Sequence, residues 1–446
     1  MTLLTADTIL TLDPEGRVLE PGYLRIRDGV LTEVAEGAPP AAESESVQEL
    51  AGRLVMPGLV NAHTHTPMVL FRGLAEGHSL LTLEGWTQAI RSWEELLDPS
   101  WIEPAVLLSC AEMIRSGTTT FADQYFSMDR IVPAVRRSGL RAALAYGIVQ
   151  LGDPSAADRE LAAAEEFLQS VAGDPRLHGW LGPHALFVDN SQALIERELA
   201  LAERYDAGLH IHLSTASEED RYCQEHFGRS AVEQMSKLGV LDHRLLAAHC
   251  LTVPEADYHL LANRLFTAVL CASACLRAGV SAPAVLAMRQ AGIQLALGTD
   301  NVANNNSYDL LAELRTLAKL ISYEAGRPDA MDAEAWVRLA TIGGAQALGL
   351  ADQIGSLEVG KQADLIGLDL TEIGWAPRRG QDWYTALVYA VSGMHVTDTM
   401  VAGDWLYRNQ AWTTLDYGQA TDELERAHAA LRQRRQPEAA HAAAGY

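Results

Sequence analysis

Hydrophobic residues between positions 57 and 351 recur in short apolar runs, and longer amphipathic stretches separate these runs. Apolar runs of this length, bounded by turn residues, predict buried strands, whereas a 3.6-residue period predicts helices. Regular alternation of the two predicts βα units, and eight such units predict an α/β fold of the (β/α)₈ TIM-barrel type. The eight expected strands span residues 59–65, 118–123, 141–147, 177–184, 208–213, 245–249, 266–272 and 293–300.

Both ends of the chain show a different pattern. Residues 23–27 and 30–34 alternate in polarity on either side of Asp28-Gly29, which is a hairpin signature. Strand–turn–strand patterns return at residues 357–369 and 396–407. We therefore expect a small β-sandwich domain built from residues 1–56 and 352–420, a barrel over 57–351, and a helical tail over 421–446.

Polar residues with metal-ligand chemistry stand at the predicted strand ends. His63 and His65 are separated by one residue in an extended segment, so their side chains point to the same side. His212 ends the fifth predicted strand and Asp300 ends the eighth. In such barrels the chemistry lies at the carboxyl ends of the strands. Three imidazoles and one carboxylate suit a single Zn²⁺, with iron as the alternative, and leave one position for water.

Other histidines at the strand ends extend this pattern. Asp300 is also the candidate general base, and His249 is expected to orient the water or the substrate. His210 shares the side of its strand with His212, so it is either a packing residue deeper in the barrel or a further ligand. Each residue by itself also fits a hydrogen-bonded structural role. The prediction of a metal site rests on their combination.

The composition of the chain limits the classes of molecule that it is expected to bind. The formal net charge of -24 disfavours binding to nucleic-acid polymers or anionic membranes, so we expect a small-molecule substrate. No apolar run approaches the ~20 residues that a membrane span needs, and the first residues do not read as a signal peptide. The five cysteines are scattered and odd in number, which is typical of reduced thiols in a cytoplasmic protein.

Several segments resemble motifs of the amidohydrolase superfamily. They are residues 56–65, 182–185, 249–251, 297–306 and 355–365, and the similarity runs from about Thr8 to about Trp412. The closest resemblance is to the branch of S-adenosylhomocysteine/methylthioadenosine deaminases and triazine chlorohydrolases. It implies one divalent metal on His63, His65, His212 and Asp300, and a homodimer. It also implies that His249 orients the water and that His184 binds the substrate.

The same resemblance suggests further substrate contacts. Glu84 would accept hydrogen bonds from a ribose diol, although a solvated position explains it equally well. Arg141 stands where this branch often has arginine, and either a substrate contact or a structural ion pair fits it. Asn304 replaces the usual serine of the final motif as a substrate-binding candidate.

One departure concerns proton transfer. These deaminases carry a Glu three residues after the fifth-strand histidine, where this chain has Thr215. Glu218 or Glu219 could reach in, or Asp300 and His249 could act alone, or the reaction differs. The leading hypothesis is deamination of an adenosine-type compound. The alternatives are a triazine, pterin or cyclic-amide hydrolase with another leaving group, and a non-catalytic scaffold.

Overall fold

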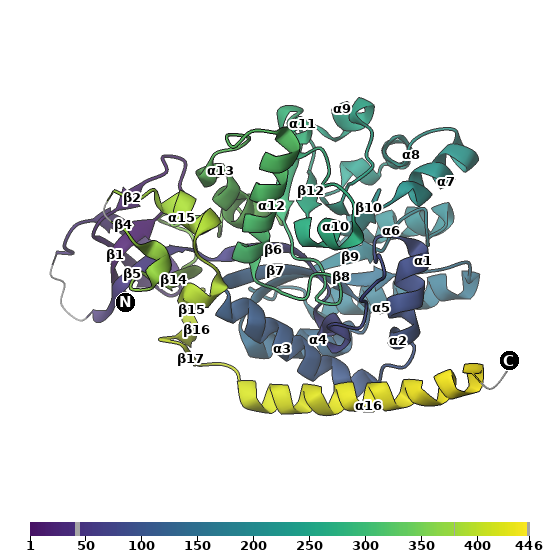
Figure 1. Ribbon diagram of the computed structural model, residues 1–446, viewed down its shortest axis with the longest axis horizontal. Coiled ribbons are helices and arrows are strands. Elements are labelled where there is room, and N and C mark those ends of the chain that lie inside the picture. The colour runs from purple at the N-terminus through teal and green to yellow at the C-terminus, as the bar shows by residue number, and fades with distance from the viewer. Residues whose placement is uncertain (41–44, 379, 444–446) are drawn as a thin grey trace.

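The chain forms a large barrel with a smaller β domain beside it. The computed structural model describes residues 1–40, 45–378 and 380–443. Figure 1 shows the first strands of the chain next to much later ones in the β domain, where the purple strands β1 and β5 lie beside the yellow-green strands β14 to β17. The barrel occupies the middle of the sequence, as the hydrophobic pattern predicts.

Eight parallel strands form the barrel, in an order that follows the sequence. Hydrogen bonds from the Asp300 amide to the His63 carbonyl (3.0 Å) and from the Thr299 amide to Asn61 Oδ1 (3.0 Å) link the last strand to the first. The expected (β/α)₈ architecture is confirmed. The strands are β6 (Leu59–Thr64), β7 (Thr118–Tyr125), β8 (Arg141–Ile148), β9 (Leu177–Pro183), β10 (Leu209–Leu213), β11 (Leu245–His249), β12 (Phe266–Leu270) and β13 (Gln294–Leu297).

Helices surround the barrel strands, and local capping fixes several of them. Asp153 caps α5 through the Ser155 amide, and Ser230 and Glu233 form a capping box that starts α8. The main helices are α3 (Ile102–Arg115), α4 (Met128–Ser138), α5 (Pro154–Ser170), α6 (Gln192–Tyr205), α7 (Ser217–Phe227), α8 (Ala231–Leu238), α10 (Ala272–Ala278), α11 (Val285–Gln290), α12 (Leu310–Ala325) and α13 (Ala333–Arg338).

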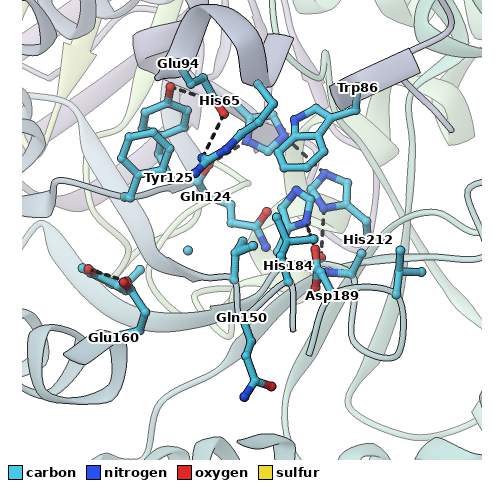
Figure 2. Close-up of a pocket in the computed structure, with 18 of the residues that line it drawn as sticks. His65, Trp86, Glu94, Gln124, Tyr125, Gln150, Glu160, His184, Asp189 and His212 are labelled. Atoms are coloured by element: carbon cyan, nitrogen blue, oxygen red, sulfur yellow. Dashed lines mark hydrogen bonds and ion pairs between the residues drawn. The ribbon is translucent and has the colours of Figure 1, made fainter. Parts of the chain in front are cut away.

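Short helical segments fill the connections. Those of the barrel are η1 (Thr66–Phe71), α1 (Leu83–Trp86), η2 (Thr87–Arg91), α2 (Ser92–Glu94), η3 (Pro99–Trp101), η4 (Val240–Asp242), η5 (Glu255–Asp257), α9 (Tyr258–Leu261), η6 (Leu339–Gly343) and α14 (Gly344–Ala347). Those near the β domain are η7 (Ile373–Trp375), α15 (Trp383–Tyr389) and η8 (Gly393–His395). The segment from η1 to α2 contributes residues to the cavity at the carboxyl ends of the strands, and Figure 2 shows two of them, Trp86 and Glu94.

The β domain is built from nine described strands that are connected in one hydrogen-bonded order. Most neighbours are antiparallel, but β1 and β5 pair in parallel. The strands are β1 (Thr2–Leu10), β2 (Val18–Leu19), β3 (Gly22–Arg27), β4 (Val30–Glu36), β5 (Ser46–Pro57), β14 (Leu365–Asp369), β15 (Val396–Val401), β16 (Asp404–Arg408) and β17 (Ala411–Trp412).

Arg141 joins the barrel to the β domain and lies away from the carboxyl ends of the barrel strands. It begins β8, at the opposite end of the barrel from the strand ends that carry the histidines. Its guanidinium Nε lies 3.1 Å from Asp364 Oδ2, and both side chains are at most 2% exposed. It also donates to the Pro175 carbonyl (3.0 Å). The substrate role expected for Arg141 is therefore replaced by the structural ion pair.

The C-terminal helix α16 (Tyr417–Ala443) begins four residues earlier than the expected tail and packs along α3 (Figure 1). His428 Nδ1 lies 2.8 Å from the Leu70 carbonyl, and Arg434 pairs with Asp98 at 3.0 Å. These contacts dock the tail on the barrel. Among the described residues, no helix combines the length and the apolar character needed to cross a membrane.

Candidate metal centre

The four predicted ligands meet at the carboxyl end of the barrel. His63 Nε2 and His65 Nε2 each lie 3.5 Å from Asp300 Oδ1. His212 Nε2 lies 3.3 Å from His65 Nε2. Side chains from β6, β10 and the end of β13 therefore converge on one point, although they are far apart in the sequence.

Contacts at Nδ1 orient each imidazole so that Nε2 faces this point. His65 Nδ1 lies 2.6 Å from the Gln124 carbonyl, and His212 Nδ1 lies 3.0 Å from the His184 carbonyl. His63 Nδ1 contacts His210 Nε2 at 2.7 Å. His210 therefore holds the ring of His63 from the side away from the candidate metal site, which fits the packing role expected for His210. Such partners fix the tautomer of metal-bound histidines.

The protonation states of the clustered histidines and of Asp300 favour binding of a cation. Burial lowers the pKa of His65 to about 3 and of His249 to about 4, so both rings are neutral near pH 7. Burial opposes ionisation of Asp300, but the contacts with His63 and His249 outweigh it and lower the pKa of the carboxyl. His63 Nε2 is buried and has no hydrogen-bond partner among the described residues. Neutral imidazoles, an ionised carboxylate and an orphaned nitrogen fit a bound metal.

His249 completes the cluster. It ends β11, its ring stacks against His212 with a centroid distance of 5.6 Å, and its donor atoms group with those of His63 and Asp300. His249 has φ of 75° and Asp300 has φ of 60°. Non-glycine residues in this region are strained, and such strain concentrates at functional sites.

The cluster opens into a cavity of about 910 Å³. His65, His212, His249 and Asp300 are among the residues that line it. Figure 2 shows Trp86 over the cavity beside His184, and their ring centroids are 5.2 Å apart. An aromatic wall beside a polar floor fits a flat, partly apolar ligand that carries a few hydrogen-bonding groups.

His184 lines the cavity, as the resemblance implies. Its Nδ1 lies 2.5 Å from Asp189 Oδ2, a partner that the sequence did not reveal. Burial opposes the charged ring, but Asp189 outweighs that effect and raises the pKa of His184. Asp189 therefore orients His184 so that its Nε2 is available to a ligand.

Glu94 is the main cavity residue that sequence reasoning missed. It is buried at the end of α2 and accepts a hydrogen bond from the Tyr125 hydroxyl (2.9 Å). Its Oε2 is buried without a hydrogen-bond partner among the described residues. The available signal was a glutamate four residues after Ile90, on the apolar side of the helical pattern.

Glu84 and Asn304 do not contact the cavity. Glu84 is exposed and pairs with Gln88 (3.0 Å) on the outer side of its helix. Asn304 is buried, and its Nδ2 donates to Asp300 Oδ2 at 2.9 Å. Both substrate roles are corrected: Glu84 is a solvated residue, and Asn304 orients the candidate metal ligand Asp300.

Thr215 lines the cavity, at the position where the deaminases that this sequence resembles carry a glutamate. Of the two nearby acids, which both line the cavity, Glu218 is half-buried and accepts from the Leu83 amide (2.9 Å). Glu219 is 4% exposed and accepts from the Ser214 amide (2.7 Å). Glu219 therefore holds the loop that carries Thr215.

We expect the Glu219→Gln protein to be stabilised relative to the parent at pH 8 but not at pH 4. Burial raises the pKa of Glu219 from 4.5 to about 8. A raised folded-state pKa gives stability that is complete below pH 4.5 and is lost as the pH rises through about 8. Glutamine mimics the neutral acid at every pH. Urea midpoints at the two pH values measure the difference, and an equal shift at both would contradict this role.

Comparisons with known proteins agree with this geometry. Residues 54–406 match the model of the Amidohydrolase family. A 5'-deoxyadenosine deaminase from Methanosarcina acetivorans is 34% identical over 94% of this chain and 95% of that protein. A 5-methylthioadenosine/S-adenosylhomocysteine deaminase from Syntrophobacter fumaroxidans is also 34% identical, over 95% of this chain and 96% of that protein.

Solved structures share the fold. An adenosine deaminase from Xanthomonas campestris with bound zinc superposes with a TM-score of 0.90 at 31% identity, over 97% of this chain and 98% of the other. The atrazine chlorohydrolase TrzN from Arthrobacter aurescens, complexed with zinc, has a TM-score of 0.86 at 22% identity, over 96% of this chain and all (100%) of the other. The second similarity shows the fold alone.

Proposed function

Since this chain belongs to the amidohydrolase family, we propose that it is a metal-dependent aminohydrolase that deaminates an adenosine-type nucleoside. The observation that carries the proposal is the convergence of His63, His65, His212 and Asp300 on the floor of a cavity with an aromatic wall. The zinc-containing adenosine deaminase, 31% identical, supports zinc as the metal, with iron as the alternative.

His63, His65, His212 and Asp300 would hold the metal. A bound divalent cation lowers the pKa of a water molecule toward neutrality. The ionised Asp300 carboxylate accepts a proton from the attacking water and returns it to the leaving amine. His249 hydrogen-bonds the oxygen that is being added to the ring. The exocyclic C–N bond breaks, ammonia leaves, and the carbon gains the oxygen of water.

Other cavity residues bind the nucleoside. Trp86 stacks on the base, and His184, held by Asp189, hydrogen-bonds one of its ring nitrogens. Glu94 takes the role that the sequence suggested for Glu84 and accepts from the ribose hydroxyls through Oε2, which lies 3.6 Å from Arg91 Nη1 and accepts no hydrogen bond among the described residues. Because the pocket supplies groups for both the base and the sugar, a nucleoside fits it better than a free base.

The direct test is ammonia release by the zinc-loaded protein from adenosine, 5'-deoxyadenosine, methylthioadenosine and S-adenosylhomocysteine. We expect turnover of at least one of them. No release from any would overturn the proposal. Thr215 favours the second candidate, a hydrolase whose leaving group needs no strong protonation, and chloride release from a chlorotriazine would support it.

We expect Glu94→Gln to raise KM for adenosine about 10–100-fold with a smaller change in kcat. A hydrogen bond to a charged group contributes about 1.5–3 kcal/mol, which is one to two powers of ten in binding. Steady-state kinetics measure the effect. 2',3'-Dideoxyadenosine is the matched control because it lacks the hydroxyls, so the variant and the parent should bind it equally. An equal loss with both substrates would argue against a ribose contact.

Cellular context and assembly belong to the same proposal. The five free cysteines are buried, which fits a reducing cytoplasm. The homodimer that the family resemblance implies stays a prediction, and sedimentation of the purified chain tests it. The complete donor set argues against a non-catalytic scaffold.

A further inference from the structure

The cavity has a second arm that the deamination chemistry does not use. It runs from the metal centre past the ends of β7 and β8 to helix α5. Tyr146, Gln150, Glu160 and Phe167 are among the residues that line it. Figure 2 shows Glu160 across the cavity from His184 and His212. A ligand whose base lies at the metal centre can therefore extend a substituent toward α5.

One face of α5 forms the wall of this arm. Ala156, Glu160, Ala163 and Phe167 all line the cavity and are spaced by three or four residues, so they lie on the same side of the helix. Alanine on either side of Glu160 leaves room around its carboxylate. Glu160 is thus the one acid among these four residues, and Arg159 and Glu166 of the same helix also line the cavity.

Glu160 is held in a defined position. The Tyr146 hydroxyl donates to its Oε2 at 3.0 Å, and Arg159 Nε lies 3.1 Å from its Oε1. The Glu160 side chain is 19% exposed, whereas that of Arg159 is 65% exposed. The arginine therefore extends into solvent, and its charge is screened more strongly than the carboxylate that faces the cavity.

The other acidic residues of this arm add to the negative charge of Glu160. Asp129, Asp153 and Glu166 also line it, while Arg159 is the one basic residue from α4, α5 and the loop between β8 and α5 in the lining. A carboxylate in a bound ligand would meet repulsion here, because Arg159 is already paired with Glu160 (3.1 Å) and Arg91, which also lines the cavity, lies 3.6 Å from Glu94. An ammonium group would meet a fixed acceptor.

We propose that this arm receives the 5'-substituent of the nucleoside and that Glu160, positioned by Tyr146, selects substituents with a cationic group over those with a carboxylate. The proposal rests on the proposed function, since it assigns the part of the substrate beyond the ribose. Glu160 is a specificity-determining residue and takes no part in the proton transfers.

Three thioethers of 5'-thioadenosine with similar length test the proposal: S-(2-aminoethyl), S-propyl and S-(2-carboxyethyl). We expect kcat/KM to fall in that order, with at least about a tenfold difference between the cationic and anionic compounds. Glu160→Gln keeps the contact with Tyr146 but removes the charge. It should reduce the ratio of aminoethyl to carboxyethyl kcat/KM by at least about fivefold.

Asp158→Asn is the matched control. Asp158 lies on the same helix and is 85% exposed on a different face, where it pairs with Arg197 at 2.7 Å. The Asp158→Asn substitution also removes one negative charge, but it should leave the ratio of aminoethyl to carboxyethyl kcat/KM unchanged. If Glu160→Gln gives unfolded protein, Tyr146→Phe, which removes the hydroxyl that positions Glu160, should lower the ratio in the same direction.

Each outcome decides the question. A parent enzyme that prefers the carboxyethyl compound, or a ratio that Asp158→Asn lowers as much as Glu160→Gln, overturns the role of Glu160. Turnover of adenosine with rejection of all three thioethers overturns the assignment of the arm. Absence of turnover with adenosine, 5'-deoxyadenosine and every thioether instead refutes the proposed function itself.

Discussion

The His65→Ala protein should bind less than about a tenth of a zinc ion per chain and lose at least about 10³-fold in kcat/KM. Loss of a supporting residue costs about 10–100-fold in metal affinity or activity, and loss of a ligand costs more. His65 Nε2 lies between Asp300 and His212, so its removal separates the remaining donors. Metal analysis after dialysis and ammonia release measure both effects.

His259→Ala is the control for this substitution. His259 is exposed, and its ring contacts the nearby Ala256 carbonyl at 2.7 Å, so the His259→Ala protein should keep full metal content and activity. A His65→Ala protein that retains zinc and activity would place the metal elsewhere. Restoration of parent activity by excess zinc would show that His65 contributes affinity alone.

Arg141→Met should lower the free energy of unfolding by about 3–5 kcal/mol, because it leaves Asp364 buried without its ionic partner. The guanidinium is at the far end of the barrel from the cavity, so kcat and KM of the folded protein should change less than about twofold. Urea denaturation and steady-state kinetics at low temperature give the two quantities.

A double variant separates charge from packing. Asp364→Asn removes the unpaired charge but still accepts a hydrogen bond from the Ala402 amide, as Asp364 does at 2.7 Å. Combining it with Arg141→Met should recover part of the lost stability. A large rise in KM for Arg141→Met without loss of stability would restore the substrate role that the sequence suggested.

Predictions from local sequence succeeded where one periodic signal was sufficient. The expected strand over 245–249 is β11 (Leu245–His249), and the expected strand over 141–147 is β8 (Arg141–Ile148). His63 and His65 point to one side because a strand alternates its side chains. The carboxyl ends of parallel strands meet at one edge of a barrel. Closure of the barrel therefore brings His63 and His65 close to His212 and Asp300.

The predictions for substrate-binding residues failed because they inferred the place of a residue in the fold from its place in a sequence motif. Glu84 and Glu94 lie on the same short helical segment, and only the path of that segment over the barrel turns Glu94 inward and Glu84 to solvent. Arg141 follows the expected motif but begins its strand, so it lies at the opposite end from the chemistry.

The sequence by itself determined the barrel, the candidate metal ligands and the absence of an acid at Thr215, because strand period and residue chemistry are local properties. Only the tertiary structure decided which carboxylates enter the cavity. Glu94, Asp189 and Glu160 come from three separate connections, and whether each faces the ligand depends on long-range packing. That packing depends on contacts among residues far apart in the chain, which a local pattern does not encode.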